Sequence, residues 1–404
     1  MPWKECTLVS ERWEFVELAS RPGANVAALC RRFGISRKTG YKWLDRHRKA
    51  TACPRTPPQA VLADRSRRPR RSPGRCCEQV EQAVLAVRAR HPAWGGRKIR
   101  AVLHREGMAD PPAASTITQI LRRHHQLGSD DGEATGPAAW QRFEHPRPND
   151  LWQMDFKGDF SLANGRRCYP LTVLDDHSRY NLALRACADQ QRVTVKQALT
   201  ATFERYGLPR RMVMDNGSPW GGPEGGHTRL TVWLLRLDIG VSHGRPYHPQ
   251  TQGKDERFHR TLGLELLRDQ AFDDHAHTQN RFDAWRPVYN FQRPHEALGM
   301  MPPAQRYQPS PRPMPATLPP IEYPAGDAVR KVQDGGWISY RGQDWRLPQA
   351  FRGEQVGLRP TERDGVLSVH FARHVIAELD LVENRVSFAG GASARYARSA
   401  AASE

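Results

Sequence analysis

The sequence predicts a multidomain protein with helical N-terminal modules, an α/β core and a small C-terminal β-barrel. Three observations support this prediction. The chain has 404 residues, which is too long for one ordinary domain. Apolar residues recur at helical spacing up to residue 127, whereas strands and helices alternate from residue 150 onward. Short β segments separated by turn residues follow Pro324.

The charge of the chain indicates a polyanionic partner. Lys and Arg number 61 against 43 Asp and Glu, a net charge of +18. Cations at this density favour nucleic acid, because phosphates release counterions when they are bound. An anionic membrane surface could use the same charge, but no segment approaches the apolar length of a spanning helix, so we expect no membrane partner. The seven cysteines contain no CxxC motif, and no signal peptide opens the chain. This indicates a reduced, cytoplasmic protein without a zinc knuckle.

Residues 1–50 are predicted to form a helix-turn-helix DNA-binding domain. A turn at Gly34 separates two short helices from a third, because glycine readily takes the left-handed conformation that ends a helix. Ser36 is predicted to cap the third helix, Arg37–Arg48. Cations crowd this helix, which favours insertion into a DNA groove over the alternative, a basic bundle that binds only proteins. The predicted DNA contacts are Arg37, Lys38, Lys42 and Arg46.

A second helix-turn-helix-like DNA-binding domain is predicted at residues 76–127, after a basic linker at 51–75. One of its helices opens at Gly95–Gly96, and the cations that follow, Arg97 and Lys98, are predicted DNA contacts. Ser115 is predicted to cap its last helix. Residues 128–148 are predicted to be a further linker.

The core, residues 149–303, shows the strand order of a ribonuclease-H-like fold. A meander of three strands comes first, and helices and strands then alternate. We expect the first and fourth strands to lie side by side, with the helix after Gly253 packed across their ends. The predicted strands and helices are Leu151–Phe160, Tyr169–Leu174, Asn181–Cys187, Val193–Tyr206, Arg211–Met214, Leu230–Leu237 and Val241–Ser242. A Pro-rich linker (304–324), a small β-barrel (325–385) and a disordered tail (386–404) complete the prediction.

Three carboxylates of the core could meet in this fold. Asp155 lies inside the first strand, Asp215 ends the fourth strand, and Glu256 begins the late helix. Hard oxygen ligands of this kind suit Mg²⁺ or Mn²⁺. Two such ions, about 4 Å apart, suit an in-line phosphoryl transfer. The alternative for Glu256 is a solvated helix face with ordinary ion pairs.

Other polar residues near these carboxylates receive structural interpretations. Asp175 and Asp176 follow a strand at a turn, where aspartate forms local hydrogen bonds. Asp255 lies about 100° around the helix from Glu256 and cannot share its direction. Packing or DNA contact is the better interpretation of three histidines, His248, His259 and His295. DNA phosphate contacts, or simply solvated charges, are expected for three cations around Glu256: Lys254, Arg257 and Arg260.

The core resembles the integrase core of bacterial insertion-sequence transposases related to retroviral integrases, the DDE class. The matching segments, in chain order, are WQMD (152–155), DDHSR (175–179), DNG (215–217), HPQTQGKDE (248–256) and RPH (293–295). The resemblance implies that Asp155, Asp215 and Glu256 form a metal-binding catalytic triad. The interval between the last two is longer than is typical, and we expect the extra residues in a flexible loop, Trp220–Gly226.

The resemblance implies a transposase that binds the terminal inverted repeats of its mobile element. It would catalyse metal-dependent DNA cleavage and strand transfer with two Mg²⁺ (or Mn²⁺) ions. Its partners would be double-stranded DNA, as element ends and target, and further copies of itself in a homo-multimer assembled on the nucleoid. Two alternatives remain open: a DNA-binding regulator with an inactive core, and a ribonuclease-H-like nuclease without strand transfer.

Overall fold

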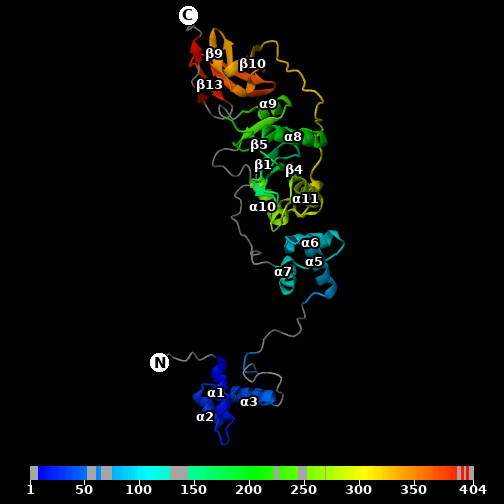
Figure 1. Ribbon diagram of the computed structural model, residues 1–404, viewed down its shortest axis with the longest axis vertical. Coiled ribbons are helices and arrows are strands. Elements are labelled where there is room, and N and C mark those ends of the chain that lie inside the picture. The colour runs from blue at the N-terminus through cyan, green and yellow to red at the C-terminus, as the bar shows by residue number, and fades with distance from the viewer. Residues whose placement is uncertain are drawn as a thin grey trace. The chain divides into compact units, whose positions relative to one another are not determined.

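The computed structural model consists of two compact units, Met1–Arg75 and Cys76–Glu404, which are described separately. It describes residues 8–51, 61–64, 75–127, 144–222, 227–243, 253–268, 270–388, 393–394 and 397–399. Figure 1 shows the helices and strands of both units. No helix in the described part of the chain is long and apolar enough to span a bilayer.

The described part of the first unit includes the helices α1 (Leu8–Ala19), α2 (Val26–Arg32) and α3 (Arg37–Thr51). The turn between α2 and α3 has the predicted form: Gly34 has a φ of +62°. Ser36 accepts a hydrogen bond from the backbone N–H of Thr39 at 3.1 Å. The packing extends beyond residue 50, because Leu62 of the predicted linker is fully buried in the same apolar cluster.

Gly40 allows α3 to approach its neighbours closely, and replacing it tests this packing. A Cβ there would lie 2.6 Å from the Cys30 Sγ and 2.9 Å from the Phe15 Cζ. We expect Gly40→Ala to destabilise the first unit by about 1–3 kcal/mol, because the added methyl overpacks the contact. Hydrogen exchange of the α2 and α3 amides would measure the loss. The double variant Cys30→Ala/Gly40→Ala should recover part of it, and unchanged exchange in Gly40→Ala would contradict the packing.

The second unit begins with three more helices, α5 (Glu78–Arg90), α6 (Gly96–Arg105) and α7 (Ala114–Arg123). They surround one apolar cluster that includes Trp94 and Ile99. Arg88 closes the module by donating to the carbonyls of Trp94 (2.9 Å) and Gln126 (2.6 Å). The predicted cap at Ser115 is wrong. Helix α7 starts at Ala114, with Ala113 at the cap position, so Ser115 lies inside the first turn.

The core sheet has the predicted topology. Its strands are β1 (Trp152–Phe156), β2 (Phe160–Ser161), β3 (Arg167–Asp175), β4 (Asn181–Cys187), β5 (Arg211–Met214) and β6 (Gly240–His243). Strand β3 pairs antiparallel with β1, β2 and β4, whereas β5 pairs parallel with β1 and β6. The predicted first and fourth strands are therefore neighbours. The strand predicted at Leu151–Phe160 is divided into β1 and β2 by a turn in which Gly158 has a φ of +79°.

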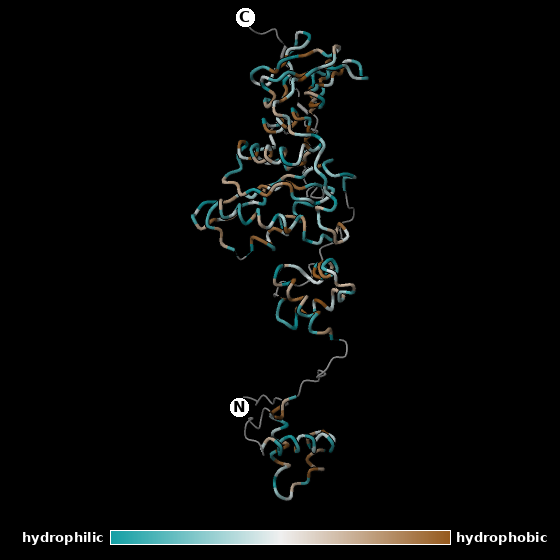
Figure 2. The backbone as a smooth tube through the Cα atoms, turned by 90° about the vertical axis from the view of Figure 1, so that its right-hand side faces the viewer, coloured by the Kyte–Doolittle hydropathy of each residue, from teal (hydrophilic) through white to brown (hydrophobic). Residues whose placement is uncertain are grey.

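Helices cover both faces of this sheet. Helices α8 (Arg192–Tyr206) and α9 (Arg229–Arg236) share an apolar cluster with Trp152 and Met154 of β1. Helices α10 (Gly253–Leu262) and α11 (His275–Pro287) share another with Leu174 and Leu184. In Figure 2, the chain in the centre of the core is coloured brown, which marks hydrophobic residues. This is the ribonuclease-H-like arrangement that the sequence predicts, with α11 as a helix that we did not predict.

The C-terminal strands form two sheets. One has the order β14-β13-β12-β11-β10-β7 and the other β15-β9-β8, and neither closes on itself within the described residues. The C-terminal β-sheet region is therefore confirmed, but the predicted small β-barrel is not. The two open sheets share an apolar cluster that Val232 and Leu235 of α9 also enter. The strands are β7 (Ala328–Lys331), β8 (Trp337–Tyr340), β9 (Gln343–Arg346), β10 (Gln355–Pro360), β11 (Val366–Phe371), β12 (His374–Asp380), β13 (Arg385–Phe388), β14 (Ser393–Ala394) and β15 (Ala397–Ser399).

Parts of the predicted disordered tail and of the predicted Pro-rich linker are ordered against these domains. Residues 386–388, predicted as part of a disordered tail, belong to β13, because Val386 and Phe388 bury their side chains in the C-terminal cluster. In the predicted linker 304–324, Arg312 donates to the carbonyls of Pro209 (2.8 Å), Leu237 (3.0 Å) and Asp238 (2.8 Å). This segment therefore lies along the core.

Candidate active site

Asp155 and Asp215 lie at the carboxyl ends of two neighbouring parallel strands. Strands β1 and β5 pair with Trp152 opposite Met212 and Gln153 opposite Val213. The same register, continued by two residues, places Asp155 beside Asp215. Neighbouring strands are about 4.8 Å apart, so the two carboxylates share one edge of the sheet.

The electrostatics of Asp155 show that these carboxylates interact. Burial, together with the negative charges of Asp215 and Glu256, raises the pKa of Asp155 to about 6. The backbone N–H of Phe156, which donates to Asp155 at 2.8 Å, acts in the opposite direction. An elevated carboxyl pKa beside other carboxylates is typical of a site that gains a cation or a proton in function.

Asp215 is held by a turn and by a tryptophan. Its Oδ1 accepts from the backbone N–H of Gly217 at 3.0 Å and from the indole N–H of Trp220. The Trp220 ring is buried and stacks on Phe156, with ring centroids 5.3 Å apart. Trp220 thus links the ends of β1 and β5. The predicted flexible loop Trp220–Gly226 is wrong at its first residue, and Pro223–Gly226 lie outside the described residues.

His259 of α10 lies beside Asp155. The sequence predicted either packing or DNA contact for this histidine. Thr172 donates its hydroxyl hydrogen to the Asp155 backbone carbonyl at 3.0 Å, so the His259 Nε2 must donate to the Thr172 Oγ1, 2.8 Å away. The Nδ1, which lies 3.9 Å from the Asp155 Oδ2, is then unprotonated. Burial lowers the pKa of His259 to about 4, so the ring is neutral near pH 7. Its spacing of four residues from Asp255 was the available sequence signal for a shared inward face.

Helix α10 presents its two acidic residues differently. Glu256 is exposed, whereas Asp255 is fully buried and neither of its carboxylate oxygens has a hydrogen-bond partner. Burial raises the pKa of Asp255 well above its usual range, and the charges of Asp155 and Asp176 add to this effect. The two side chains point in different directions, as expected from their spacing. In the part of the chain that the structure describes, no three His, Cys, Asp or Glu side chains are placed to hold a metal ion.

The remaining polar residues near the site are engaged within the protein. Asp175 accepts from the backbone N–H of Asn149 and from the backbone and hydroxyl of Ser178, at 2.6–2.8 Å. Burial of His295 lowers its pKa to about 3, which fits packing better than a charged contact. His248 and the rest of the first part of its motif, residues 248–252, lie outside the described residues.

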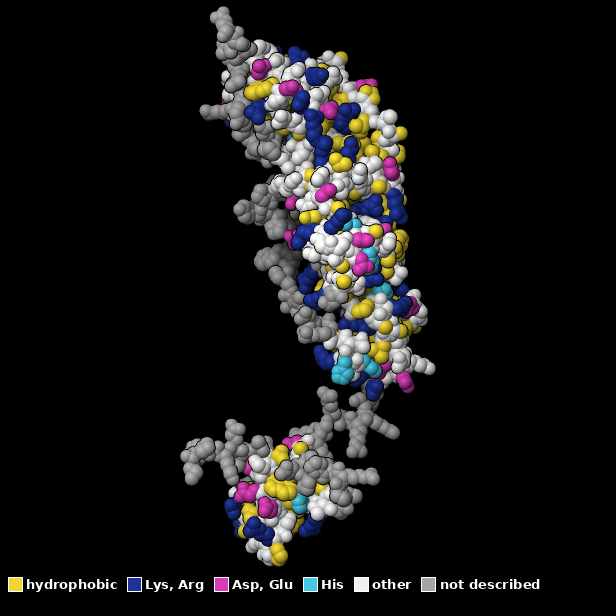
Figure 3. Space-filling view, viewed as in Figure 1, with side chains coloured by type: hydrophobic (Ala, Val, Ile, Leu, Met, Phe, Trp, Pro, Cys, Tyr) yellow, Lys and Arg dark blue, Asp and Glu magenta, His cyan; other side chains and the backbone are white. Residues whose placement is uncertain are grey.

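The predicted DNA contacts occupy different environments. On α3, Arg37, Lys38 and Lys42 are exposed, and the charged ends of Lys42 and Arg46 lie 4.4 and 4.6 Å from the Trp43 ring centroid. Arg97 and Arg257 lie 3.3 and 3.9 Å from Glu296, and Arg260 is exposed. Lys98 is half-buried, and burial lowers its pKa to about 8. Lys254 forms an ion pair with Asp176. Figure 3 shows Lys and Arg side chains on the visible surface of both units.

Comparisons with known protein families define the class. The integrase core domain matches residues 145–249 and 237–303, and homeodomain-like domains match 7–54 and 39–121. The C-terminal domain of IS481 family transposases matches residues 327–387. The resemblance expected from the sequence, to insertion-sequence transposases with a retroviral-integrase-like core and an N-terminal helix-turn-helix, is therefore confirmed.

Individual relatives come from bacterial insertion elements. The uncharacterized 39.2 kDa protein of insertion element IS476 from Xanthomonas euvesicatoria is 32% identical over 39% of this chain and 44% of its own length. The uncharacterized 31.7 kDa protein of IS407 from Burkholderia multivorans is 30% identical over 39% of this chain and 55% of its own. The chain therefore spans about half the length of these relatives. The putative transposase of IS5376 from Geobacillus stearothermophilus is 23% identical over 60% of this chain and 62% of its own.

Solved retroviral structures are also similar. The magnesium complex of the HTLV-2 integrase catalytic core, in its trimeric form, is 13% identical, with a TM-score of 0.31 over 40% of this chain and 99% of that one. The simian T-cell lymphotropic virus intasome in complex with the PP2A regulatory subunit B56 gamma is 15% identical, with a TM-score of 0.34 over 72% of this chain and 96% of that one.

Proposed function

We propose that this protein is a DDE transposase that cuts the ends of its own mobile element and joins them to target DNA. The observation that carries the proposal is the pair Asp155 and Asp215 on neighbouring parallel strands of an integrase core, electrostatically coupled to Glu256. The net charge of +18 supports a DNA substrate. Homeodomain-like segments before the core support recognition of specific DNA ends.

The donor set suits divalent cations. Asp155, Asp215 and Glu256 offer hard carboxylate oxygens. Their mutual repulsion, which adds to burial in raising the pKa of Asp155, would be relieved by a cation. We propose two Mg²⁺ or Mn²⁺ ions, held by Asp155 and Asp215 with Glu256 as the third acidic ligand. When bound, they supply activation of the attacking oxygen and charge stabilisation of the leaving oxygen.

The protein's own side chains would orient these ligands and keep the site in one arrangement. Trp220 and Gly217 hold one oxygen of Asp215, and the N–H of Phe156 holds one of Asp155. In the first reaction, a water oxygen loses a proton and bonds to the scissile phosphorus, the bond from phosphorus to the 3′ oxygen breaks, and the 3′ oxygen takes up a proton to become a hydroxyl. In the second, this 3′-hydroxyl bonds to a target phosphorus, loses its proton and displaces the target's own 3′ oxygen. No protein nucleophile is required.

The other domains would recognise DNA and assemble the complex. We propose that Arg37, Lys38, Lys42 and Arg46 contact the element ends, with Arg97 and Lys98 of the second module and Arg257 and Arg260 of α10 as further DNA contacts. Joining two ends implies a homo-multimer on DNA, for which the C-terminal sheets offer DNA-binding or subunit-binding surfaces. The protein would act in the cytoplasm, on nucleoid DNA.

Strand transfer by the purified full chain tests the proposal. We would incubate it with labelled ends of its own element, a target plasmid and Mg²⁺ or Mn²⁺. Joined products are expected only with metal and with the element's own ends. Deleting residues 1–127 should reduce them more than about a hundredfold, because specific DNA binding exceeds non-specific binding by about 10³ or more.

Other outcomes would favour the alternative functions. Cleavage without joining, retained after deletion of residues 1–127, would indicate a ribonuclease-H-like nuclease. Specific binding of the ends without metal-dependent products would indicate a regulator with an inactive core. Unrelated DNA ends and excess EDTA serve as controls.

A further inference from the structure

Asp176 is a buried carboxylate that receives hydrogen bonds from three separate parts of the core. Its Oδ2 accepts from the backbone N–H of His145 at 2.9 Å. Its Oδ1 accepts from the side-chain amide of Gln153 at 2.8 Å and from the ammonium group of Lys254. The Lys254 ammonium also reaches the backbone carbonyl of Asp176, at 3.3 Å. The Asp176 side chain is only 2% exposed, so these donors replace its solvent.

Two of these donors lie beside proposed metal ligands. Gln153 is two residues before Asp155 on β1, and residues at this spacing share one face of a strand. Lys254 is two residues before Glu256, in the first turn of α10. The same oxygen of one carboxylate therefore holds both the strand that carries Asp155 and the helix that carries Glu256.

Within the described part of the chain, the contact between Lys254 and Asp176 is the polar attachment of the first turn of α10 to the core. Asp255, the next residue, is buried with no hydrogen bond, and Glu256 itself is exposed. The apolar anchors Phe258 and Leu262 lie further along the helix. Without the Lys254 contact, the turn that carries Glu256 would be attached chiefly through the following turns.

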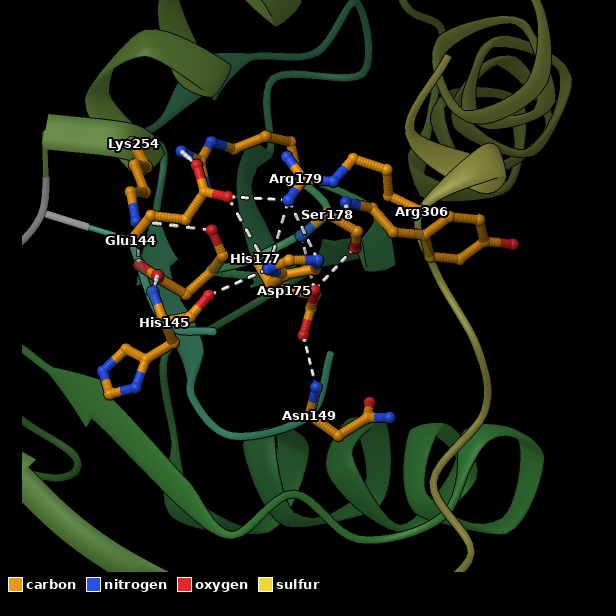
Figure 4. Close-up of polar contacts among 11 residues, drawn as sticks. Glu144, His145, Asn149, Asp175, His177, Ser178, Arg179, Lys254 and Arg306 are labelled. Carbon is orange, nitrogen blue, oxygen red and sulfur yellow. Dashed lines mark hydrogen bonds and ion pairs between the residues drawn. The ribbon is translucent and has the colours of Figure 1, made fainter. Parts of the chain in front are cut away.

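The residues next to Asp176 and His145 in the chain form further polar contacts. Figure 4 shows Glu144 meeting His177, Arg179 and Arg306, while Asp175 meets Ser178 and Asn149 and Lys254 approaches from α10. Glu144 lies 3.2 Å from Arg179 and 2.9 Å from Arg306. Charged groups fixed by several partners hold one geometry, so Asp176 is a well-placed anchor.

We propose that Asp176 and Lys254 form a latch that positions Glu256 relative to Asp155. The two are positioning residues, and the charge of Lys254 is used inside the protein in place of the DNA phosphate contact expected from the sequence. This inference rests on the proposed function, because it concerns the placement of the third acidic ligand. A buried ion pair contributes little net stability but can select one arrangement of the elements that it joins.

The test compares full-length Lys254→Met, Asp176→Asn and the double variant with wild type. Lys331→Met, an exposed lysine of β7, is the matched control. In both single variants the Mg²⁺ concentration for half-maximal strand transfer should rise about tenfold or more, as for other residues that orient metal ligands. The rate at saturating Mg²⁺ should fall much less. The double variant should resemble the single ones, and Lys254→Arg should recover part of the loss.

Hydrogen exchange provides a readout that does not need activity. Amides of α10 should exchange faster in Lys254→Met than in wild type or Lys331→Met. The Mg²⁺ concentration that slows this exchange should also rise about tenfold. An unchanged Mg²⁺ requirement, or additive effects of the two substitutions, would overturn the latch. If wild type performs no strand transfer, the proposed function fails, and exchange alone decides whether the latch exists.

Discussion

Asp155→Asn is expected to reduce strand transfer at least about a thousandfold, a loss of about 4 kcal/mol in transition-state stabilisation. The substitution keeps the shape of the side chain but removes the charge that would bind a metal at the ends of β1 and β5. Initial rates at fixed Mg²⁺ would measure the effect. Asp159→Asn is the control, because it removes an exposed carboxylate that forms an ion pair with Arg167. It should leave the rate within about threefold of wild type. Near-normal strand transfer by Asp155→Asn would remove this residue from the site.

The pH dependence of stability distinguishes the loss of strand transfer in Asp155→Asn from a loss of folding. Its folded pKa, about 6, is raised above the ordinary value of 3.8, so the folded state binds this proton more tightly than the unfolded state. The resulting stabilisation is complete below pH 3.8 and is lost as the pH rises through about 6. Metal-free Asp155→Asn should therefore be at least as stable as wild type at pH 7, although it is inactive. At limiting Mg²⁺, wild-type activity should rise with pH through this same range, because a protonated carboxyl does not bind the metal.

Asp255→Ala is expected to stabilise the metal-free core by about 1–3 kcal/mol at pH 7, the typical cost of a buried polar group without a partner. Both oxygens of Asp255 lack hydrogen bonds, and Asp155 and Asp176 are its charged neighbours. Hydrogen exchange of the β3 and β4 amides would measure opening of the core. Asp364→Ala, at an exposed position, should change stability by less than about 0.5 kcal/mol.

The stability gained by Asp255→Ala should increase with pH. The folded pKa of Asp255 is raised well above 3.8, so the contribution of its proton to stability is complete below pH 3.8 and is lost as the pH rises through the folded pKa. The stability of the variant relative to wild type should therefore rise as the pH increases from about 4. A loss of stability at pH 7 would contradict the prediction and would show that the Asp255 carboxylate has a stabilising partner in the folded protein.

Local signals in the sequence predicted much of the fold. The turn at Gly34 and the cap at Ser36 depend on backbone conformation and one side chain, and both are present. Strand β5 begins and ends at the predicted residues, Arg211 and Met214, because an apolar run ends at a turn signal. The cap at Ser115 was wrong because helix start signals are accurate only to within a few residues.

Contacts between distant segments account for the errors. The barrel was predicted from short β segments alone, but sheet closure depends on whether the edge strands pair, and α9 supplies part of the apolar core instead. The Pro-rich stretch 304–324 has the composition of a linker, yet Arg312 binds carbonyls of the core. Composition cannot report hydrogen bonds to partners that lie 74 to 103 residues away in the chain.

The sequence by itself determined the order of the core strands and the resemblance to integrase cores, and it predicted the three acidic site residues, because these depend on residue type, spacing and motif. Only the tertiary structure decided how the site is held together. It placed His259 and Thr172 against Asp155, Trp220 against Asp215, and Asp255 in the interior without a partner. It also paired Lys254 with Asp176. The physical reason is that burial, pKa and hydrogen bonding belong to the environment that several segments create together, whereas a sequence records each residue alone.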